Sequence, residues 1–230
     1  MKAIVEDDVY RMDGIKRDTN KMRLLLRSLA RNESTTVTNR TLKNDVKEID
    51  DEDIDANTIN EYLNIFERLF LINNQKPFAA SVRSSVRIKQ AVKRHFVDPS
   101  ISAALLGVTS SSLLNDLETL GLLFEALCER DLQIYADAFG GSLYHYQDYK
   151  NREIDAVVEC PDGEWCAFEI KLGANQIDAA AEGLLRLKAE FEADPRGRPP
   201  KVLCVLCGLS NAAYQRPDGV FVVPLTALRD

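Results

Sequence analysis

The chain lacks the features that mark membrane, secreted and ATP-hydrolysing proteins. It contains no run of eighteen apolar residues, so no membrane-spanning helix is expected. The N-terminal segment turns acidic at Glu6 and provides no signal-peptide core. A Gly-x(4)-Gly-Lys-Ser/Thr motif is also missing, so this polypeptide has no loop of that type to hold the phosphates of ATP. We therefore expect a cytoplasmic protein without ATPase activity of its own.

Cysteine usage argues against a disulfide framework. There are five cysteines, an odd number, and most of them stand within apolar runs. Cys204 and Cys207 form a C-x-x-C pair, but the pair lies inside an apolar strand pattern, and no second pair of ligands stands at a spacing that suits zinc. We interpret the cysteines as small packed side chains in a reducing compartment.

Positive charge is scarce in the second part of the chain. The whole sequence has 29 Lys and Arg against 36 Asp and Glu, a net charge of −7. Residues 1–104 carry 18 basic and 16 acidic side chains, whereas residues 105–230 carry 11 and 20. Because diffuse attraction to nucleic acid requires a basic excess, any DNA contact has to come from a local basic patch.

The most informative segment is 152–171, which has the pattern of two strands and a tight turn. Residues 153–159 are rich in β-branched side chains, and residues 165–171 form a second strand-like run. Pro161-Asp162-Gly163 between them is a turn signal. The sequence therefore predicts an antiparallel β-hairpin here.

Three ionisable side chains are expected to meet on this hairpin: Asp155, Glu169 and Lys171. Glu169 and Lys171 are two residues apart, so both leave the same face of a strand, and Asp155 is expected roughly opposite them. Carboxylates suit a hard divalent cation such as Mg²⁺, and a neighbouring lysine can orient an attacking water. The alternative is an ordinary solvent-facing group of charges, because this spacing also occurs often by chance.

Further segments with regular patterns flank the hairpin. Residues 113–130 and 176–192 have helical periodicity, and residues 202–207 form an apolar strand. The apolar stripe of the first helix consists of Leu113, Leu117, Leu120, Phe124 and Leu127. The predicted order is therefore helix, strands, helix, strand.

In this order and in these charged residues the chain resembles the PD-(D/E)xK nuclease superfamily, whose core runs α-β-β-β-α-β. The resemblance covers residues 113–207. Asp155 matches the motif aspartate, and Glu169 and Lys171 match the E-x-K. Glu125 matches the acidic residue often found on the first helix of that core.

The resemblance implies a role for each of these residues. Asp155 and Glu169 would hold Mg²⁺ or Mn²⁺, with the carbonyl oxygen of Ile170 as a third ligand. Lys171 would position the attacking water. Glu125 would support this metal ion or a second one.

Nearly the whole chain also resembles the C-terminal part of a prokaryotic AAA-type ATPase that carries a DUF4143 domain. The segments that carry this resemblance are 57–63 (NTINEYL), 67–72 (ERLFLI), 93–99 (KRHFVDP) and 122–125 (LLFE). In that family the ATPase domain lies upstream, so this sequence is expected to be either a fragment or a natural remnant of a longer ancestor. Many members have a decayed nuclease-like site, whereas this sequence keeps every acid and the lysine.

The first hundred residues have the pattern of a winged-helix-like domain. Helical periodicity occurs at 21–30, 39–46 and 56–69, and Asp55 is a suitable N-cap for the third helix. Residues 70–72 lead into 77–80, and residues 93–98 are expected as a returning strand, so this part resembles a wing. Such a unit can bind DNA, or it can serve as a protein-interaction or packing module.

The expected wing is basic. No Asp or Glu occurs between residues 76 and 94, so its cations could follow a phosphate backbone. These cations are Lys76, Arg83, Arg87, Lys89, Lys93 and Arg94. The third helix is a poorer candidate for DNA contact, because Glu61 and Glu67 would repel phosphates.

The sequence thus predicts an α/β (α+β) protein with two domains. A winged-helix-like helical domain at residues 1–104 is followed by a restriction-endonuclease-like αβββαβ domain at residues 105–230. The expected function is Mg²⁺- or Mn²⁺-dependent hydrolysis of phosphodiester bonds in DNA. The alternative is a non-catalytic DNA- or protein-binding module of a DUF4143 ATPase family member that lacks its ATPase domain, with DNA, an ATPase or another protein as its partner.

Overall fold

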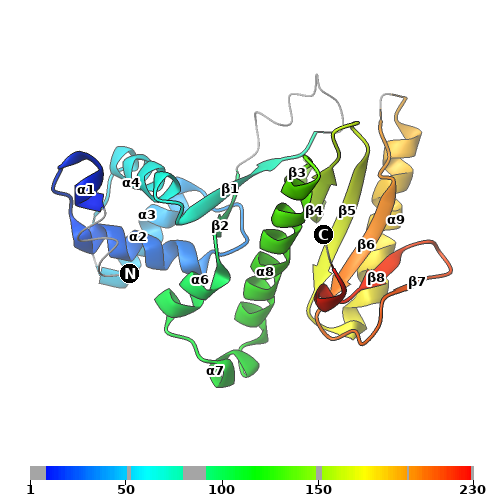
Figure 1. The fold of residues 1–230 in the computed structure, drawn as a ribbon. Helices are drawn as coiled ribbons and strands as arrows, with labels where there is room; N and C mark the ends of the chain where they lie inside the picture. Colours follow the sequence, from blue (N-terminus) through cyan, green and yellow to red (C-terminus); the bar gives the residue numbers. More distant parts are fainter. Residues whose placement is uncertain (1–8, 51–52, 80–91, 149–151, 196, 229–230) are drawn as a thin grey trace. The chain divides into compact units, whose positions relative to one another are not determined.

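The computed structural model of the chain describes residues 9–50, 53–79, 92–148, 152–195 and 197–228 (Figure 1). These residues separate into two compact units, each with its own core. The first unit comprises residues 1–74 and 93–116, and the second comprises residues 75–92 and 117–230. The sequence predicts one domain boundary, at residue 104. In the structure, the second unit also contains the short segment that begins at Gln75.

The first unit is built from helices α1 (Val9–Asp13), α2 (Thr19–Arg31), α3 (Asn39–Asp50), α4 (Ala56–Arg68), α6 (Pro99–Leu106) and α7 (Ser110–Leu114). The three helices predicted from periodicity are confirmed as α2, α3 and α4. Asp55 caps α4 as expected, because its carboxylate accepts the backbone N–H groups of Asn57 at 2.8 Å and Thr58 at 3.0 Å. One cluster of buried apolar side chains joins α1, α2, α3 and α4, and residues of α6 pack against it.

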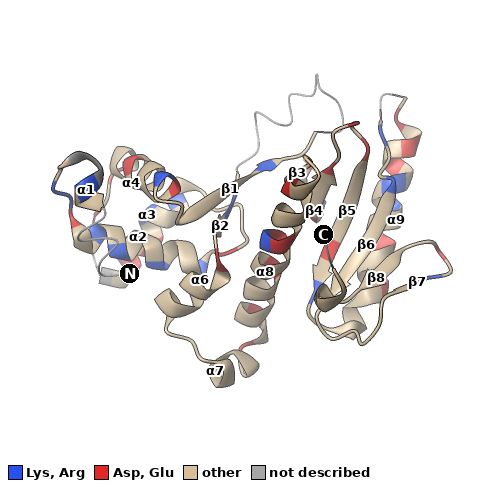
Figure 2. Ribbon diagram, viewed as in Figure 1, with Lys and Arg blue, Asp and Glu red and all other residues tan. Residues whose placement is uncertain are grey.

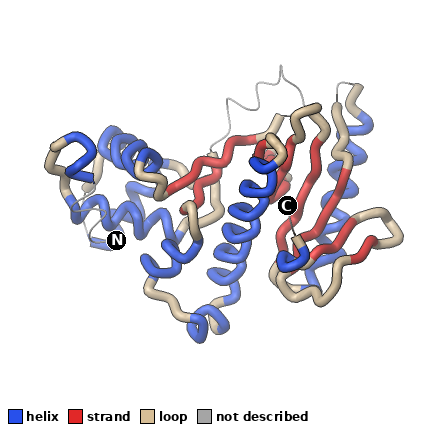
Figure 3. The backbone as a smooth tube through the Cα atoms, viewed as in Figure 1, coloured by secondary structure: helices blue, strands red, loops and turns tan. Residues whose placement is uncertain are grey.

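Two strands follow α4, namely β1 (Ile72–Pro77) and β2 (Lys93–Phe96), and they are neighbours in the sheet (Figure 3). Strands at both ends of the basic segment are therefore confirmed. The last residues of β1 belong to the second unit, where Lys76 and Pro77 pair in parallel with Tyr144 and His145 of strand β3 (Ser142–Gln147). The described structure thus contains three helices and a strand pair in the order that the sequence predicts.

The second unit contains helix α8 (Leu117–Ala138), then β3, β4 (Glu153–Glu159) and β5 (Trp165–Lys171), the short turn η2 (Ala174–Gln176), and helix α9 (Ile177–Ala193). Strands β6 (Val202–Cys207), β7 (Tyr214–Gln215) and β8 (Phe221–Val223) and the turn η3 (Leu225–Ala227) complete it. The helix, three strands, helix, strand order predicted from the sequence is therefore present as α8-β3-β4-β5-α9-β6.

In the described part of the chain the strands form a mixed sheet of eight strands in the order β2-β1-β3-β4-β5-β6-β8-β7. Pairing is antiparallel from β3 to β4 and from β4 to β5, and parallel from β5 to β6 and from β6 to β8. The parallel β5–β6 step needs a crossover connection, and α9 supplies it. This arrangement places the predicted hairpin, β4 and β5, near the middle of the sheet.

Two apolar clusters cover β4 and β5, one with each long helix. Alternate strand residues divide between them: Val157 and Ala167 pack with α9, whereas Val158 and Ile170 pack with α8. Because successive side chains of a strand point to opposite faces, α8 and α9 cover opposite faces of these strands. The hairpin is therefore an internal element of the second unit and not an exposed ribbon.

The predicted helix at 113–130 is wrong in its extent. Thr109 forms a capping box with Ser112 and starts the short helix α7, which ends at Leu114. A new helix, α8, begins at Leu117 and continues to Ala138. Leu117, placed on the predicted apolar stripe, is 62% exposed. The buried face of α8 instead consists of Leu123, Ala126, Cys128, Glu129, Leu132 and Ala136.

None of the helices in the described part of the chain combines the length and the apolar content that crossing a membrane would require.

Candidate functional site

A β-bulge shapes strand β4 at Asp155. On β3, Tyr144 pairs with Val157 and Tyr146 pairs with Ile154, so a single residue of β3 stands opposite two residues of β4, Asp155 and Ala156. Such a bulge re-aims side chains and often occurs beside functional sites. The apolar contacts agree with it: Ile154 and Val157 both pack in the α9-side cluster, although strict alternation would put them on opposite faces.

The pairing of β4 with β5 ends at the same place. The last backbone partners at this end are Ala156 and Phe168, one step before Asp155 and Glu169. Beyond this point the Asp155 side chain links the two strands, because its Oδ2 accepts the backbone N–H of Ile170 at 2.7 Å. The carboxylate is thereby fixed against the neighbouring strand.

Lys171 lies between the two predicted carboxylates. Its Nζ is 3.0 Å from Asp155 Oδ2 and 2.7 Å from Glu169 Oε2. The side chains of Asp155 and Glu169 are only 14% and 13% exposed, and that of Lys171 is 27% exposed. The structure therefore brings together Asp155, Glu169, Ile170 and Lys171 in one partly buried cluster.

The charges in this cluster change the proton affinity of its members. Burial, followed by the nearby charge of Asp155, raises the pKa of Glu169 to about 8. Burial alone would lower the pKa of Lys171, but the charges of Asp155 and Glu169 outweigh that effect and raise it. The cluster thus contains a firmly charged ammonium group and a carboxyl group, Glu169, whose proton affinity is higher than usual because it is buried beside Asp155.

Glu125, the fourth predicted site residue, lies half-buried on α8, the helix that covers one face of β4 and β5. Within the described residues, no group of three or more His, Cys, Asp or Glu side chains could hold a metal ion. Glu125 therefore does not complete a three-carboxylate site with Asp155 and Glu169. A metal ion here would rely on these two carboxylates, a backbone carbonyl such as that of Ile170, and water, which are the oxygen ligands that Mg²⁺ accepts.

The predicted nucleic-acid contacts are only partly visible. Arg83, Arg87 and Lys89 lie outside the described residues. Lys93 is 6% exposed, so little of its side chain is available to a phosphate. Arg94 is half-buried, and its guanidinium donates to the carbonyl of Val37 at 2.8 Å. Lys93 and Arg94 are thus engaged inside the first unit, whereas Lys76, the third described cation of the predicted set, is exposed on β1.

The C-x-x-C pair and His145 have buried positions, whereas Cys160 and Cys166 are only partly buried. Cys204 and Cys207 are buried on β6 without a disulfide, as the strand pattern predicted. His145 is 3% exposed on β3, in the gap opposite the bulge of β4. The C-x-x-C pair thus lies inside a strand of the core.

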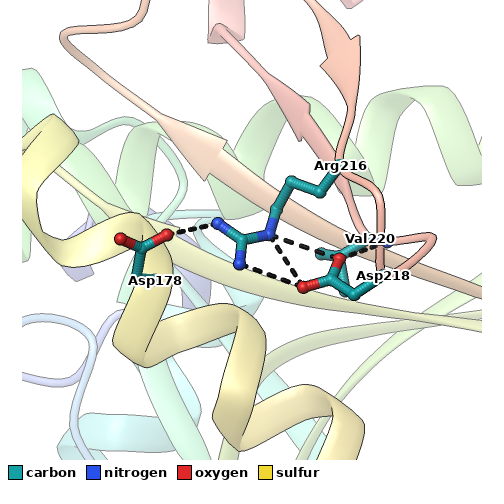
Figure 4. A network of polar contacts seen from close by, with 4 residues as sticks. All are labelled: Asp178, Arg216, Asp218 and Val220. Carbon is teal, nitrogen blue, oxygen red and sulfur yellow. Dashed lines mark hydrogen bonds and ion pairs between the residues drawn. The ribbon is translucent and has the colours of Figure 1, made fainter.

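A polar cluster around Arg216 links the β7–β8 connection to the start of α9 (Figure 4). The guanidinium of Arg216 contacts Asp178 in the first turn of α9 and donates to Asp218 Oδ2 at 3.0 Å. Asp218 in turn accepts the backbone N–H of Val220 at 3.2 Å. Only the short turn η2 separates β5 from α9. The contacts of Arg216 therefore help to hold the helix that follows the candidate site.

Sequence reasoning missed the bulge at Asp155–Ala156 and the exposed aromatic ring of Phe70. Phe70 lies in the segment between the third helix and the predicted wing, yet it is 80% exposed and has a φ of 54°. Its N–H donates to Glu67 and that of Leu71 to Phe66, a helix end that usually has glycine at this position. Phe70 also borders an open hollow of about 670 Å³ at the end of α4. That hollow contains none of the candidate catalytic residues.

Comparison with family models divides the chain in nearly the same place as the structure. Residues 1–112 match a domain of unknown function, DUF8612, and residues 120–228 match another domain of unknown function, DUF4143. Comparison with curated proteins gave no match, and neither did comparison with solved structures. The chain therefore contains an N-terminal DUF8612 domain followed by a DUF4143 domain.

Proposed function

We propose that the second unit hydrolyses phosphodiester bonds in DNA with the help of a divalent metal ion. The observation that carries this proposal is the meeting of Asp155 and Glu169 on Lys171, with distances of 3.0 and 2.7 Å from its Nζ. Two carboxylates and a lysine at the splayed ends of two strands are the charged groups that such chemistry needs. The α8-β3-β4-β5-α9-β6 order is also that of the PD-(D/E)xK nucleases.

Each residue then has a chemical role. Asp155 and Glu169 would bind Mg²⁺ or Mn²⁺ together with the Ile170 carbonyl. Lys171 would orient the attacking water and offset charge on the phosphate. The bound ion would lower the pKa of the water and neutralise the developing charge. The hydrogen bond from Ile170 keeps Asp155 in place for this task.

A second candidate function is a binding module without catalysis, which would recognise DNA or a protein and could direct a partner ATPase. The charge balance favours this candidate, because residues 105–230 carry 11 basic against 20 acidic side chains. Acidic positions predominate along α8 in Figure 2. A surface of this kind attracts a phosphate backbone weakly.

Cleavage assays separate the two candidates. The purified chain is incubated with supercoiled, linear and branched DNA in Mg²⁺ or Mn²⁺, in parallel with Asp155→Asn, Glu169→Gln and Lys171→Met. We expect cleavage by the unaltered chain and a loss of at least about 100-fold in each variant. Lys188→Gln, which removes a lysine from the surface of α9, is the matched control and should cleave normally. DNA left intact by the unaltered chain with both metals would favour the binding module.

A further inference from the structure

The ammonium group of Lys171 lies between the two carboxylates that would hold a metal ion. It contacts one oxygen of Asp155 and one of Glu169, at 3.0 and 2.7 Å. Both carboxylates are largely buried, with 14% and 13% of their side chains exposed. A bridging cation at this point holds the two carboxylates together, because two like charges at such close range repel each other strongly in a partly buried site.

A divalent ion and this ammonium group compete for the same oxygens. Mg²⁺ binds carboxylate oxygens at about 2.0–2.1 Å and tolerates little departure from octahedral geometry. An ion bridging Asp155 Oδ2 and Glu169 Oε2 would therefore stand within a few ångströms of Lys171 Nζ in its present position. Two cations at such a distance repel each other, so the ammonium has to move when the ion enters.

The structure allows this movement without any change of the strand. The backbone of Lys171 is fixed, because it pairs with Cys207 of β6 and its carbonyl accepts the N–H of Gly208 at 3.0 Å. Its side chain, in contrast, is 27% exposed and has a flexible four-carbon stem. The ammonium can thus leave the two carboxylates while the main chain stays in place.

We propose that Lys171 is a displaceable counter-ion of the metal site. Without metal its ammonium neutralises and spaces Asp155 and Glu169. A divalent cation displaces the ammonium, which then faces the solvent side where a phosphate group would bind. This inference rests on the proposed function of the site, and it adds that the lysine opposes metal binding in the free protein.

The proposal is tested by titrating Mg²⁺ calorimetrically into the full chain at pH 8.5. The titration is repeated at pH 9, because loss of the Lys171 charge raises the pKa of Glu169 further in the Lys171→Gln variant. Lys171→Gln is expected to bind Mg²⁺ about tenfold more tightly than the unaltered chain, since the competing charge is removed. Lys188→Gln serves as the control, because it removes the same charge from the surface of α9 and should leave the affinity unchanged.

Thermal denaturation gives a second readout. Without metal, Lys171→Gln is expected to melt at a lower temperature than the unaltered chain, because its carboxylates lack their counter-ion. Mg²⁺ should then raise the melting temperature of this variant by more than it raises that of the unaltered chain. Should Lys171→Gln fail to fold, Lys171→Arg is measured instead; it keeps the cation and should bind Mg²⁺ no more tightly than the unaltered chain.

The outcomes separate this inference from the proposed function. Equal or weaker Mg²⁺ binding by Lys171→Gln would overturn the displacement of the lysine and leave the metal site standing. Tighter binding by Lys171→Arg would overturn it as well. Failure of both the unaltered chain and Lys171→Gln to bind Mg²⁺ or Mn²⁺ would remove the metal site and this inference together.

Discussion

At the scale of single residues, the first unit contains a buried acid that the sequence did not single out. Glu33 is 1% exposed, and its carboxyl group accepts the N–H of Phe96 at 3.0 Å and the hydroxyl of Ser102. His95 Nδ1 lies 3.7 Å from the same carboxyl group. Glu33 therefore joins the segment after α2 to β2 and α6. Burial raises its pKa to about 7, although the hydrogen bond from Ser102 opposes the shift.

This raised pKa makes stability depend on pH in a definite direction. The folded protein keeps the proton of Glu33 at pH values where the unfolded chain has lost it. The resulting stabilisation is fully present below about pH 4.5 and is lost as pH rises through about 7. The full shift corresponds to about 3 kcal/mol of unfolding free energy.

We predict that Glu33→Gln removes this dependence, because glutamine mimics the neutral acid at every pH. Urea denaturation of both proteins at pH 5.5 and 8.5 checks it, with the unaltered chain losing more stability than the variant over this interval. Parallel losses in the two proteins would show that Glu33 titrates normally.

At the scale of elements, the bulge of β4 decides where Asp155 points. The two residues Asp155 and Ala156 stand opposite one residue of β3, and the pairing with β5 stops beside them. Removing one residue would restore regular pairing. It would also keep Ile154 and Val157 on the α9 side, since a single residue would then separate them.

We therefore predict that deleting Ala156 leaves a folded second unit with a changed site. Asp155 would move into the position that Ala156 now has and lose its hydrogen bond from Ile170. Binding of Mg²⁺ and DNA cleavage should both disappear. The loss of stability should exceed the roughly 1–3 kcal/mol that the hydrogen bond and the buried methyl group contribute, because Asp155 would enter the apolar cluster that now buries Ala156. Circular dichroism and Mg²⁺ calorimetry measure the two effects. Retained metal binding in the deletion variant would show that the bulge does not position Asp155.

At the scale of the whole molecule, each unit has its own core, and the second is assembled from two separate parts of the sequence. Phe78 is fully buried there, with its ring 4.7 Å from that of Trp165 and 5.8 Å from that of Tyr144. Trp165 also donates its indole N–H to the carbonyl of Arg198 at 2.9 Å. The segment that follows β1 thus supplies a central side chain to a core formed mainly by residues after 117.

Trp165 is the single tryptophan of the chain, so its fluorescence reports on the second unit. We predict that Phe78→Ala destabilises this unit by about 3–5 kcal/mol, the usual cost of removing a buried phenylalanine ring. The fluorescence transition in urea should move to lower concentration. The part of the circular dichroism signal that comes from the helices of the first unit should keep its midpoint. A shift of less than 1 kcal/mol would mean that Phe78 adds little to this core.

The sequence by itself determined the local elements. The N-cap Asp55, the apolar periodicity of α4, the turn at 161–163 and the apolar run of β6 are signals carried by neighbouring residues. A tight turn also fixes the register of the hairpin that it closes. For this reason the meeting of Asp155 with Glu169 and Lys171 was predictable from the sequence alone.

Tertiary structure decided what depends on partners distant in the sequence. The bulge at Asp155 exists because β4 pairs with β3 on one side and with β5 on the other. The burial of Lys93 and Glu33, and the entry of Phe78 into the second core, depend on contacts between segments far apart in the chain. No local pattern carries this information, since the free energy of burying a charge or a ring is set by the side chains that surround it in space.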